Sequence, residues 1–308
     1  MTIKILEPGP LTTVQDPFGR PGWRHVGVPV GGAADPWSAR LANRLVGNPD
    51  DAPLLEITLG GALIATDELA WMALTGGLRA EAGAIELPIH EAWRLRPGGS
   101  VRIRAADGAR GYLAIRGGFL VERVLGSTAT DLRAGFGGLE GRALLAGDRL
   151  EVGPMTGPTA RWTGTRSTGP IRIVAGPHTA AIDALGAEWT VAVEADRAGV
   201  RLDGPRIEGG EVPSMGLPLG AIQVPPDGRP IVMLADRPVT GGYRAPASVI
   251  RADIGRVAQL LTGDGLSFAS VTAEEAIKAL HQAEGELAKI EPLEAAGEDG
   301  LAWAGSHE

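Results

Sequence analysis

Short apolar runs alternate with Gly, Pro and Asp through most of the chain. Runs of this kind, apolar at every second position or continuously, are typical of β-strands bounded by turns. They predict strands at residues 4–6, 54–59, 71–75, 101–104, 111–116, 171–174 and 231–235. The pattern therefore predicts a mainly β protein.

Helical patterns occur at only a few places. In the strongest, Asp35 and Pro36 precede apolar residues at helical spacing up to residue 46, and Gly47 follows. Asp is a good N-cap, Pro suits the first helical position, and Gly suits the end of a helix. Further short helices are predicted at about 178–185, 253–261 and 272–287, the last with a capping box of Thr272 and Glu275.

A weak internal repeat bears on the domain organisation. Residues 143–152 and 259–268 both place a Gly-containing turn before an apolar strand, and 95–103 is a looser copy. This similarity is equally compatible with chance. Together with the Gly-, Pro- and Thr-rich stretch 156–169, which reads as a linker, it favours an N-terminal domain at 1–160 and a C-terminal domain at 170–290. The Glu-, Ala- and Gly-rich segment 291–308 predicts a disordered tail.

The composition of the chain excludes several classes of protein and of functional site. The chain has 308 residues, 46 of them Gly and 23 Pro, yet 44% are hydrophobic, which favours a turn-rich compact protein over a disordered one. The net charge of -8 argues against nucleic-acid binding, which needs a cationic surface. Cysteine is absent, which excludes disulfides, thiolate nucleophiles and Cys-based zinc sites. The five histidines lack metal-ligand spacing, so no dedicated metal site is expected.

The N-terminus lacks the cationic and apolar regions of a signal peptide, and no apolar run is long enough to span a bilayer. We therefore expect a cytoplasmic protein without membrane attachment.

Two distant stretches, 9–35 and 220–243, combine polar side chains with turn-forming Gly and Pro. Polar groups presented on shaped loops are typical of ligand-binding sites. We predict that both stretches contribute to one composite site, with the candidate residues Gln15, Asp16, Arg20, Arg24, His25, Gln223, Thr240 and Tyr243.

Each candidate in the first stretch also has a structural alternative. His25 suits proton transfer at neutral pH, or it bonds a loop carbonyl. Asp16 orients a catalytic partner, or it forms an ordinary turn before a proline. Arg20 and Arg24 clamp a carboxylate or phosphate, or they form ion pairs. Asp35 fits a helix cap better than a catalyst.

The second stretch has the same ambiguity. Gln223 ends an apolar run, where its amide either contacts a substrate amide or satisfies neighbouring backbone. Tyr243 follows two glycines, which permit close approach of a ligand or of backbone, and Thr240 precedes them. Asp236 and Arg237 are expected to form an internal ion pair that holds the loop.

The blocks GPLTTVQD at 9–16, GRPGWRHVGVPVGGA at 19–33, TDLRAG at 130–135, GGLEGRAL at 137–144, GAIQVPPDGRPIV at 220–232 and LADRPVTGGY at 234–243 occur in one order. In these blocks the chain resembles the family of C-type subunits of 5-oxoprolinase, also called allophanate hydrolase subunit 2 or the biotin-dependent carboxyltransferase family. The resemblance extends from about residue 5 to about residue 268. It implies two cyclophilin-like β-barrel units in tandem with a few short helices.

The resemblance also implies a function. The C-type polypeptide of a 5-oxoprolinase acts with B-type and A-type subunits to open 5-oxo-L-proline to L-glutamate with ATP, and we expect this chain to be inactive alone. ATP with Mg²⁺ is expected in the complex, with no tightly bound cofactor in this chain. On this reading His25, Asp16 and Arg20 are the candidate catalytic residues. The candidate substrate-binding residues are Gln15, Gln223, Tyr243, Arg24 and Thr240.

Two alternatives stay open at the level of sequence. One is a carboxyltransferase-type component that acts on urea or a related amide with a biotinylated partner. The other is a non-enzymatic regulator that binds a B-type kinase-inhibitor protein. The family often has Met where this chain has Ala34 and Pro where it has Arg244, which leaves the substrate undetermined. No biotin-acceptor motif accompanies the resemblance, so a complete urea carboxylase is not expected.

Overall fold

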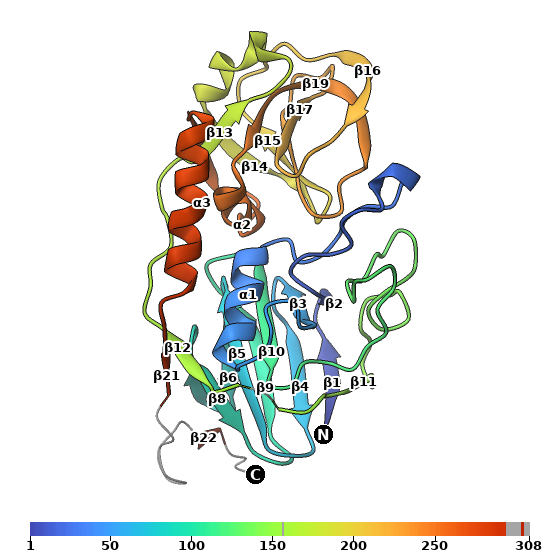
Figure 1. Ribbon diagram of the computed structural model, residues 1–308, viewed down its shortest axis with the longest axis vertical. Coiled ribbons are helices and arrows are strands. Elements are labelled where there is room, and N and C mark those ends of the chain that lie inside the picture. Colours follow the sequence, from blue (N-terminus) through green and yellow to red (C-terminus); the bar gives the residue numbers. More distant parts are fainter. Residues whose placement is uncertain (156, 294–302, 305–308) are drawn as a thin grey trace. The chain divides into compact units, whose positions relative to one another are not determined.

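The computed structural model describes residues 1–155, 157–293 and 303–304 (Figure 1). These residues are mainly β with a few short helices, which confirms the predicted fold class. They group into two compact units. Unit 1 contains Met1–Arg20, Asp35–Gly164 and the described residues from Leu287 onward, and unit 2 contains Pro21–Ala34 and Thr165–Glu286.

These units differ from the predicted domains, 1–160 and 170–290, at two places. The segment Pro21–Ala34 belongs to unit 2, which otherwise comes from the second half of the chain, and the segment from Leu287 returns to unit 1. The stretch expected as a linker contains a strand, β12 (Ala160–Trp162), which pairs with β21 (Ile290–Pro292). Apart from 291–293 and 303–304, the predicted disordered tail lies outside the described residues.

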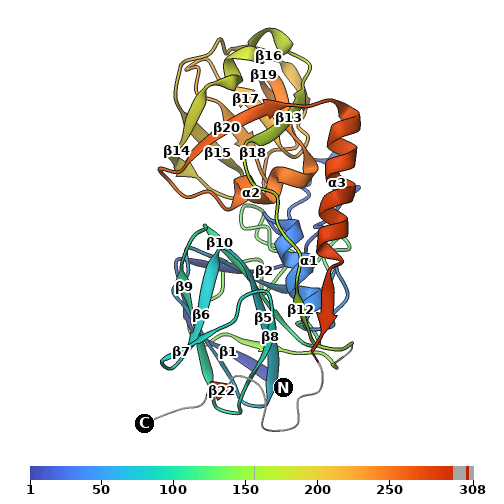
Figure 2. The ribbon, with the colours of Figure 1, turned by 90° about the vertical axis from the view of Figure 1, so that its left-hand side faces the viewer.

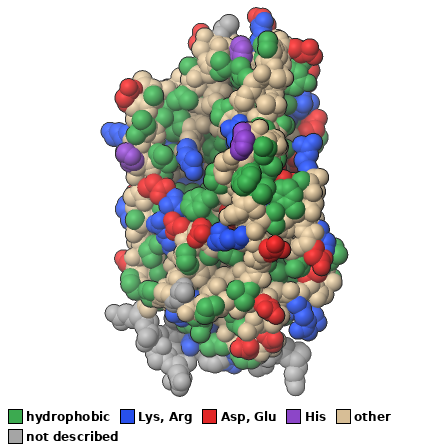
Figure 3. Space-filling view, turned by 45° about the vertical axis from the view of Figure 1, so that its right-hand side comes forward, with side chains coloured by type: hydrophobic (Ala, Val, Ile, Leu, Met, Phe, Trp, Pro, Cys, Tyr) green, Lys and Arg blue, Asp and Glu red, His purple; other side chains and the backbone are tan. Residues whose placement is uncertain are grey.

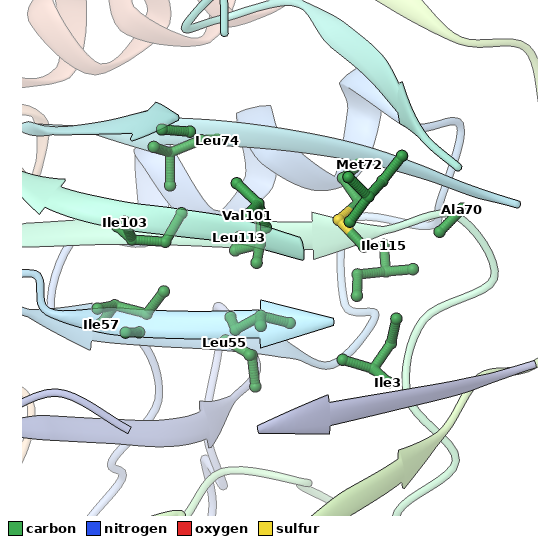
Figure 4. Packing of buried hydrophobic residues seen from close by; sticks show 14 of the residues in the cluster. Ile3, Leu55, Ile57, Ala70, Met72, Leu74, Val101, Ile103, Leu113 and Ile115 are labelled. Atoms are coloured by element: carbon green, nitrogen blue, oxygen red, sulfur yellow. The ribbon is translucent and has the colours of Figure 1, made fainter. Parts of the chain in front are cut away.

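Unit 1 has two six-stranded sheets, with strand orders β11-β1-β4-β9-β6-β7 and β2-β3-β10-β5-β8-β22. Side chains of both sheets fill one core, including Ile3 and Val101 from the first sheet and Leu55, Met72 and Leu113 from the second (Figure 4). Each such fully buried side chain contributes about 1.5–3 kcal/mol relative to an exposed one. The strands are β1 (Thr2–Pro8), β2 (Leu11–Gln15), β3 (Leu54–Thr58), β4 (Ala62–Thr66), β5 (Ala70–Gly76), β6 (Leu78–Ala82), β7 (Ile85–Leu87), β8 (Ala92–Leu95), β9 (Ser100–Ala105), β10 (Arg110–Ile115), β11 (Arg149–Glu151) and β22 (Trp303–Ala304).

Unit 2 has one eight-stranded sheet in the order β13-β20-β14-β15-β18-β17-β19-β16 (Figure 2). Because β13 also pairs with β19, the first seven strands of that order close into a ring, and β16 extends β19 at its edge. Closure leaves fewer unpaired strand edges than an open sheet of the same strands would. The strands are β13 (Ile171–Ala175), β14 (Glu188–Ala195), β15 (Gly199–Asp203), β16 (Glu211–Gly216), β17 (Ala221–Val224), β18 (Ile231–Met233), β19 (Thr240–Val249) and β20 (Gly265–Ser270).

Two of the four predicted helices form at about their predicted lengths, a third is shorter, and the region 178–185 contains only 3₁₀ turns. In α1 (Pro36–Leu45) the side chain of Asp35 accepts from the Ser38 backbone N–H at 3.2 Å. In α3 (Ala273–Leu287) Thr272 and Glu275 form the predicted capping box, at 2.8 and 3.1 Å. The other regions form short 3₁₀ turns, η2 (Thr179–Ala181), η3 (Asp183–Gly186) and η4 (Arg251–Asp253), and the brief helix α2 (Ile254–Ala258). No helix among the described residues is long and apolar enough to cross a bilayer.

The weak sequence repeat corresponds to a recurring turn. In each copy a glycine with positive φ donates its N–H to a strand carbonyl, and the carbonyl of the next residue accepts the N–H of the same strand residue. The glycine and strand residues are Gly147 with Ile5, Gly263 with Val191, and Gly98 with Thr66. The repeat therefore reflects one local structure that occurs in both units.

Candidate functional site

The predicted site residues are divided between the two units. Gln15, Asp16 and Arg20 lie in unit 1, whereas the others lie in unit 2: Arg24, His25, Gln223, Thr240 and Tyr243. The boundary passes through the first polar stretch, between Arg20 and Pro21. A composite site that contains both groups stays a prediction, and each group is described within its own unit.

Asp16, directly after β2, has both carboxylate oxygens occupied. Oδ1 accepts from the backbone N–H groups of Phe18 at 3.0 Å and Gly19 at 2.6 Å. Oδ2 accepts from the Ser127 hydroxyl at 2.5 Å and from the Thr128 backbone N–H at 2.8 Å and hydroxyl at 3.2 Å. The side chain is only 2% exposed. This geometry joins two loops of unit 1 and favours the structural alternative for Asp16, while its predicted role in orienting a catalytic partner stays a prediction.

Arg20 is completely buried in the same part of unit 1. Its guanidinium donates to the carbonyl of Ala129 and lies over the Phe136 ring, 4.7 Å from the ring centroid. Close to it, a Cβ on Gly138 would lie 2.0 Å from the hydroxyl oxygen of Thr130, so only glycine fits there. Residues directly before and after the TDLRAG block, Ala129 and Phe136, thus contact Arg20, and Gly137 of the GGLEGRAL block lies close to its Nη2.

Gln15, the last residue of β2, is also fully buried. Its Nε2 donates to the Thr13 hydroxyl at 3.0 Å and to the Thr130 carbonyl at 3.3 Å. Its Oε1 has no hydrogen-bond partner among the described residues. The amide donors of Gln15 are therefore already used within unit 1, and only its acceptor is left.

A row of buried polar residues that the sequence analysis did not single out continues from Thr13 across the second sheet. Thr13 lies opposite Glu56 in the strand register, and Glu56 lies opposite Tyr112. Arg110 Nε is 3.8 Å from Glu56 Oε1, and the Tyr112 hydroxyl accepts from the Asp35 backbone N–H at 2.8 Å. Burial raises the pKa of the Tyr112 hydroxyl well above its usual value, and the nearby Glu56 and Asp35 carboxylates add to this shift. The sequence feature that could have predicted this row is Glu56, a charged residue inside a continuous apolar run.

In unit 2, two arginines meet at one carbonyl group. Arg24 Nη2 donates to the Leu217 carbonyl oxygen at 2.7 Å and to that of Val239 at 3.1 Å. Arg237 Nε donates to the same Leu217 oxygen at 3.1 Å, and its Nη1 donates to Leu234 at 3.1 Å. The bonds of Arg24 hold the short 3₁₀ turn η1 (Arg24–Val26) against the rest of unit 2.

The expected ion pair between Asp236 and Arg237 does not form. Asp236 instead binds Arg197 through both carboxylate oxygens, at 2.8 and 2.9 Å. Arg237 is 7% exposed. Burial, reinforced by the positive charge of Arg24 and opposed by Asp236, lowers the pKa of Arg237 to about 10.

Gln223, Thr240 and Tyr243 lie near this pair of arginines. Gln223 is buried and its Nε2 donates to the Tyr243 carbonyl at 3.3 Å. A Cβ on Gly241 would lie 2.6 Å from both Gln223 Nε2 and Leu217 Cδ1, so this glycine permits the close approach of two side chains, where the sequence predicted a ligand or backbone. Tyr243 is 36% exposed, and Thr240 is exposed.

His25 is exposed on η1, where its Nδ1 lies 2.9 Å from the Gly22 carbonyl oxygen. Its ring stacks on Trp23 with 6.5 Å between centroids and 19° between planes. These contacts match the structural alternative for His25, and its catalytic role stays a prediction.

On the face drawn in Figure 3, acidic, basic and apolar side chains are interspersed. Surface arginines of both units pair with carboxylates, as Arg102 does with Glu7 and Arg201 with Asp227, each at 2.8 Å. Exposed pairs of this kind contribute little stability, about 0–1 kcal/mol each. Arg24 and Arg237 differ from them, because both bind backbone carbonyls instead.

Residues 26–270 match the model of a family described as carboxyltransferase domain, subdomain A and B. The chain belongs to this family. It is 39% identical to the C-type subunit of 5-oxoprolinase from Escherichia coli K12 over 292 residues, which cover 90% of this chain and 94% of that protein. It is also 34% identical to the urea amidolyase of Saccharomyces cerevisiae, over 88% of this chain but 17% of that protein. The resemblance found in the sequence is thereby confirmed.

The fold has a counterpart among solved structures. The crystal structure of K. lactis urea amidolyase matches with a TM-score of 0.86 and 29% identity, over 98% of this chain and 21% of that chain. This chain therefore corresponds to about a fifth of that larger protein.

Proposed function

We propose that this protein is the C-type subunit of an ATP-dependent complex that opens 5-oxo-L-proline to L-glutamate together with B-type and A-type subunits. The observation that carries the proposal is the similarity to the C-type 5-oxoprolinase polypeptide of Escherichia coli, which extends over 94% of that protein. The chain alone is expected to be inactive, and ATP with Mg²⁺ is expected to act in the complex.

The polar groups of unit 2 suit this chemistry. Opening a lactam places negative charge on a poorly reactive amide oxygen, and donors held in position stabilise that charge. The exposed Tyr243 hydroxyl and the exposed Thr240 hydroxyl are such donors, and Gln223 supports the strand that carries them through its bond to the Tyr243 carbonyl. We assign these residues to substrate binding and His25 to proton transfer.

The buried residues of unit 1 receive a different assignment. Asp16 and Arg20 hold loops together through bonds that leave them little or no exposed surface. We propose that they act as positioning residues, and that Gln15 joins them through its bond to the Thr130 carbonyl.

A second function is favoured by one observation. The similarity to urea amidolyase, in sequence and in structure, supports a carboxyltransferase-type component that acts on urea or a related amide with a biotinylated partner. In that case the same donors in unit 2 stabilise charge on the oxygen of the acceptor amide.

The test is reconstitution of the complex. The chain is co-expressed with B-type and A-type subunits, the mixture is separated by size exclusion, and glutamate formed from 5-oxo-L-proline is measured with and without ATP. We expect co-elution, and glutamate formation that requires ATP and all three chains.

The variant that tests the assigned site is Tyr243→Phe, which removes one hydroxyl and keeps the ring. It should lower kcat while leaving co-elution and the melting temperature unchanged. Separate elution at micromolar concentrations, or glutamate formation without this chain, would refute the proposed function. Urea-dependent turnover with a biotinylated carrier would support the second function instead.

A further inference from the structure

Two positively charged side chains of unit 2 lie side by side. Arg24 and Arg237 donate to the same Leu217 carbonyl oxygen from 2.7 and 3.1 Å, so their guanidinium groups are neighbours. Within the described part of the chain, neither arginine forms a salt bridge: their hydrogen bonds all go to backbone carbonyls. One neutral oxygen does not balance two charges.

The nearest acidic side chain in sequence is already engaged. Asp236, adjacent to Arg237, is bound by Arg197 through both carboxylate oxygens. The positive charge of Arg24 adds to the effect of burial in lowering the pKa of Arg237. Like charges held together at a buried position are unfavourable unless an anion accompanies them. Asp236 offsets the positive charge of this pair only in part, because its carboxylate is shared with Arg197.

Both guanidinium groups keep unused donors. Arg24 bonds through Nη2 alone, and Arg237 bonds through Nε and Nη1, so nitrogen atoms of each have no partner among the described residues. Arg24 is half-buried, which leaves access from solvent. Planar guanidinium forks match the two oxygens of a carboxylate.

The surroundings make this a specific position rather than a diffuse charged surface. Leu217 supplies the shared carbonyl, and its side chain and the Gln223 amide both lie against Gly241. Gln223 and Tyr243 are joined by the bond from the Gln223 amide. The arginine pair thus adjoins the residues assigned to amide binding.

We propose that Arg24 and Arg237 together bind the carboxylate of a small carboxylate-bearing ligand. The identity of the ligand rests on the proposed function: 5-oxo-L-proline carries a carboxylate on its lactam ring, so the arginine pair would hold the carboxylate and the neighbouring donors would face the lactam amide. In this arrangement Arg237 is a ligand-binding residue, whereas the sequence predicted only a structural ion pair for it.

The experiment is a chemical-shift titration of the full chain by NMR, which measures millimolar affinities. Three probes separate the two ends of the ligand: 5-oxo-L-proline, 2-pyrrolidinone, which has the lactam without the carboxylate, and acetate, which has the carboxylate without the lactam. We expect 5-oxo-L-proline to bind at least about tenfold more tightly than 2-pyrrolidinone.

Three variants complete the design. Arg24→Gln removes one charge, Arg237→Lys keeps the charge but loses the planar fork, and each should weaken 5-oxo-L-proline binding at least about tenfold. Arg251→Gln is the matched control, because Arg251 is an exposed arginine of the same unit, and it should bind like the unaltered chain. Melting temperatures are measured for all three. If Arg237→Lys fails to fold, the affinity of Arg24→Gln for 5-oxo-L-proline alone tests the proposal.

The outcomes distinguish this inference from the proposed function. If 5-oxo-L-proline binds equally well to the chain and to both arginine variants, the inference is overturned while the proposed function stands. If acetate binding depends on both arginines but 5-oxo-L-proline has no advantage over acetate, the anion site stands and 5-oxo-L-proline is not its ligand. If no probe shows binding that depends on the arginines, the anion site is refuted.

Discussion

Replacement of Asp16 by Asn tests whether the most polar stretch of the chain begins with a structural residue or a catalytic one. The two oxygens of Asp16 accept five hydrogen bonds from two loops, and the side chain is 2% exposed. An asparagine has one acceptor oxygen and an NH₂ group in place of the other. Because Oδ1 accepts from the backbone N–H groups of Phe18 and Gly19, and Oδ2 accepts from that of Thr128, the NH₂ group meets a backbone N–H donor in either orientation of the amide.

The magnitude follows from these contacts. A buried donor that loses its acceptor costs about 1–3 kcal/mol, and hydrogen bonds to a charged acceptor are about twice as strong as neutral ones. With at least one backbone N–H unsatisfied and the remaining bonds weakened, we expect Asp16→Asn to destabilise unit 1 by about 3 kcal/mol. For a unit of this size that lowers the melting temperature by about 6–12 °C.

Asp131→Asn provides the matched control in the same loop region. Among the described residues, only its Oδ1 accepts hydrogen bonds, from the backbone N–H groups of Arg133 at 3.1 Å and Ala134 at 3.0 Å, and an asparagine oxygen can keep both. The control should change stability by less than about 1 kcal/mol. Both variants are compared by thermal and urea unfolding of the full chain. A melting temperature for Asp16→Asn within a degree or so of the unaltered chain, together with lost activity in the complex, would show that Asp16 is catalytic.

Three further predictions concern stability. Asp35→Ala removes the side chain that accepts from Ser38 at the start of α1, and it should cost about 1–2 kcal/mol in thermal unfolding. Gly138→Ala should cost more than about 2 kcal/mol in the same measurement, because Gly138 has a φ of 54° and a Cβ there would lie 2.0 Å from the buried hydroxyl of Thr130. A value near zero would show that the loop moves aside. The pKa of Asp253 is lowered because hydrogen bonds from Arg172 outweigh its burial, so the stabilisation it provides is present above its unfolded pKa of 3.8 and is lost as the pH falls below that value. The difference in unfolding free energy between the unaltered chain and Asp253→Asn should therefore shrink below about pH 4, and a difference independent of pH would contradict this account.

The strands and α1 were predictable because their signals are local. A run such as 111–116 is apolar over the length of a strand, and Asp35, Pro36 and Gly47 mark the ends of α1 by their own backbone preferences. The family was predictable for a related reason, since the order of short blocks can be read without any knowledge of how they pack. The repeat was also readable, because the same Gly turn beside a strand recurs at Gly147 and Gly263.

The partners of the polar residues were not predictable, because they come from distant parts of the chain. Asp16 is bound by residues 127–128, more than a hundred positions away, and nothing in either stretch specifies the other. Arg237 shows the same limit. Its neighbour Asp236 was the obvious partner by sequence, yet strand geometry gives that carboxylate to Arg197 instead.

The crowding of polar residues around 9–35 has a physical explanation in the path of the chain. The segment Pro21–Ala34 leaves unit 1 and returns to it, and backbone that passes between units has no sheet partner for its N–H and C=O groups. Side chains satisfy some of these groups instead: Asp16 accepts from the backbone N–H groups of Phe18 and Gly19, and Arg197 donates to the Gly32 carbonyl. Arg24, within the segment, donates to carbonyls elsewhere in unit 2, those of Leu217 and Val239. The polar, Gly- and Pro-rich character of this stretch therefore has a structural explanation beside the predicted binding site. Loss of activity after a substitution at Asp16 or Asp35 identifies a catalytic group only where the unfolding free energy is unchanged.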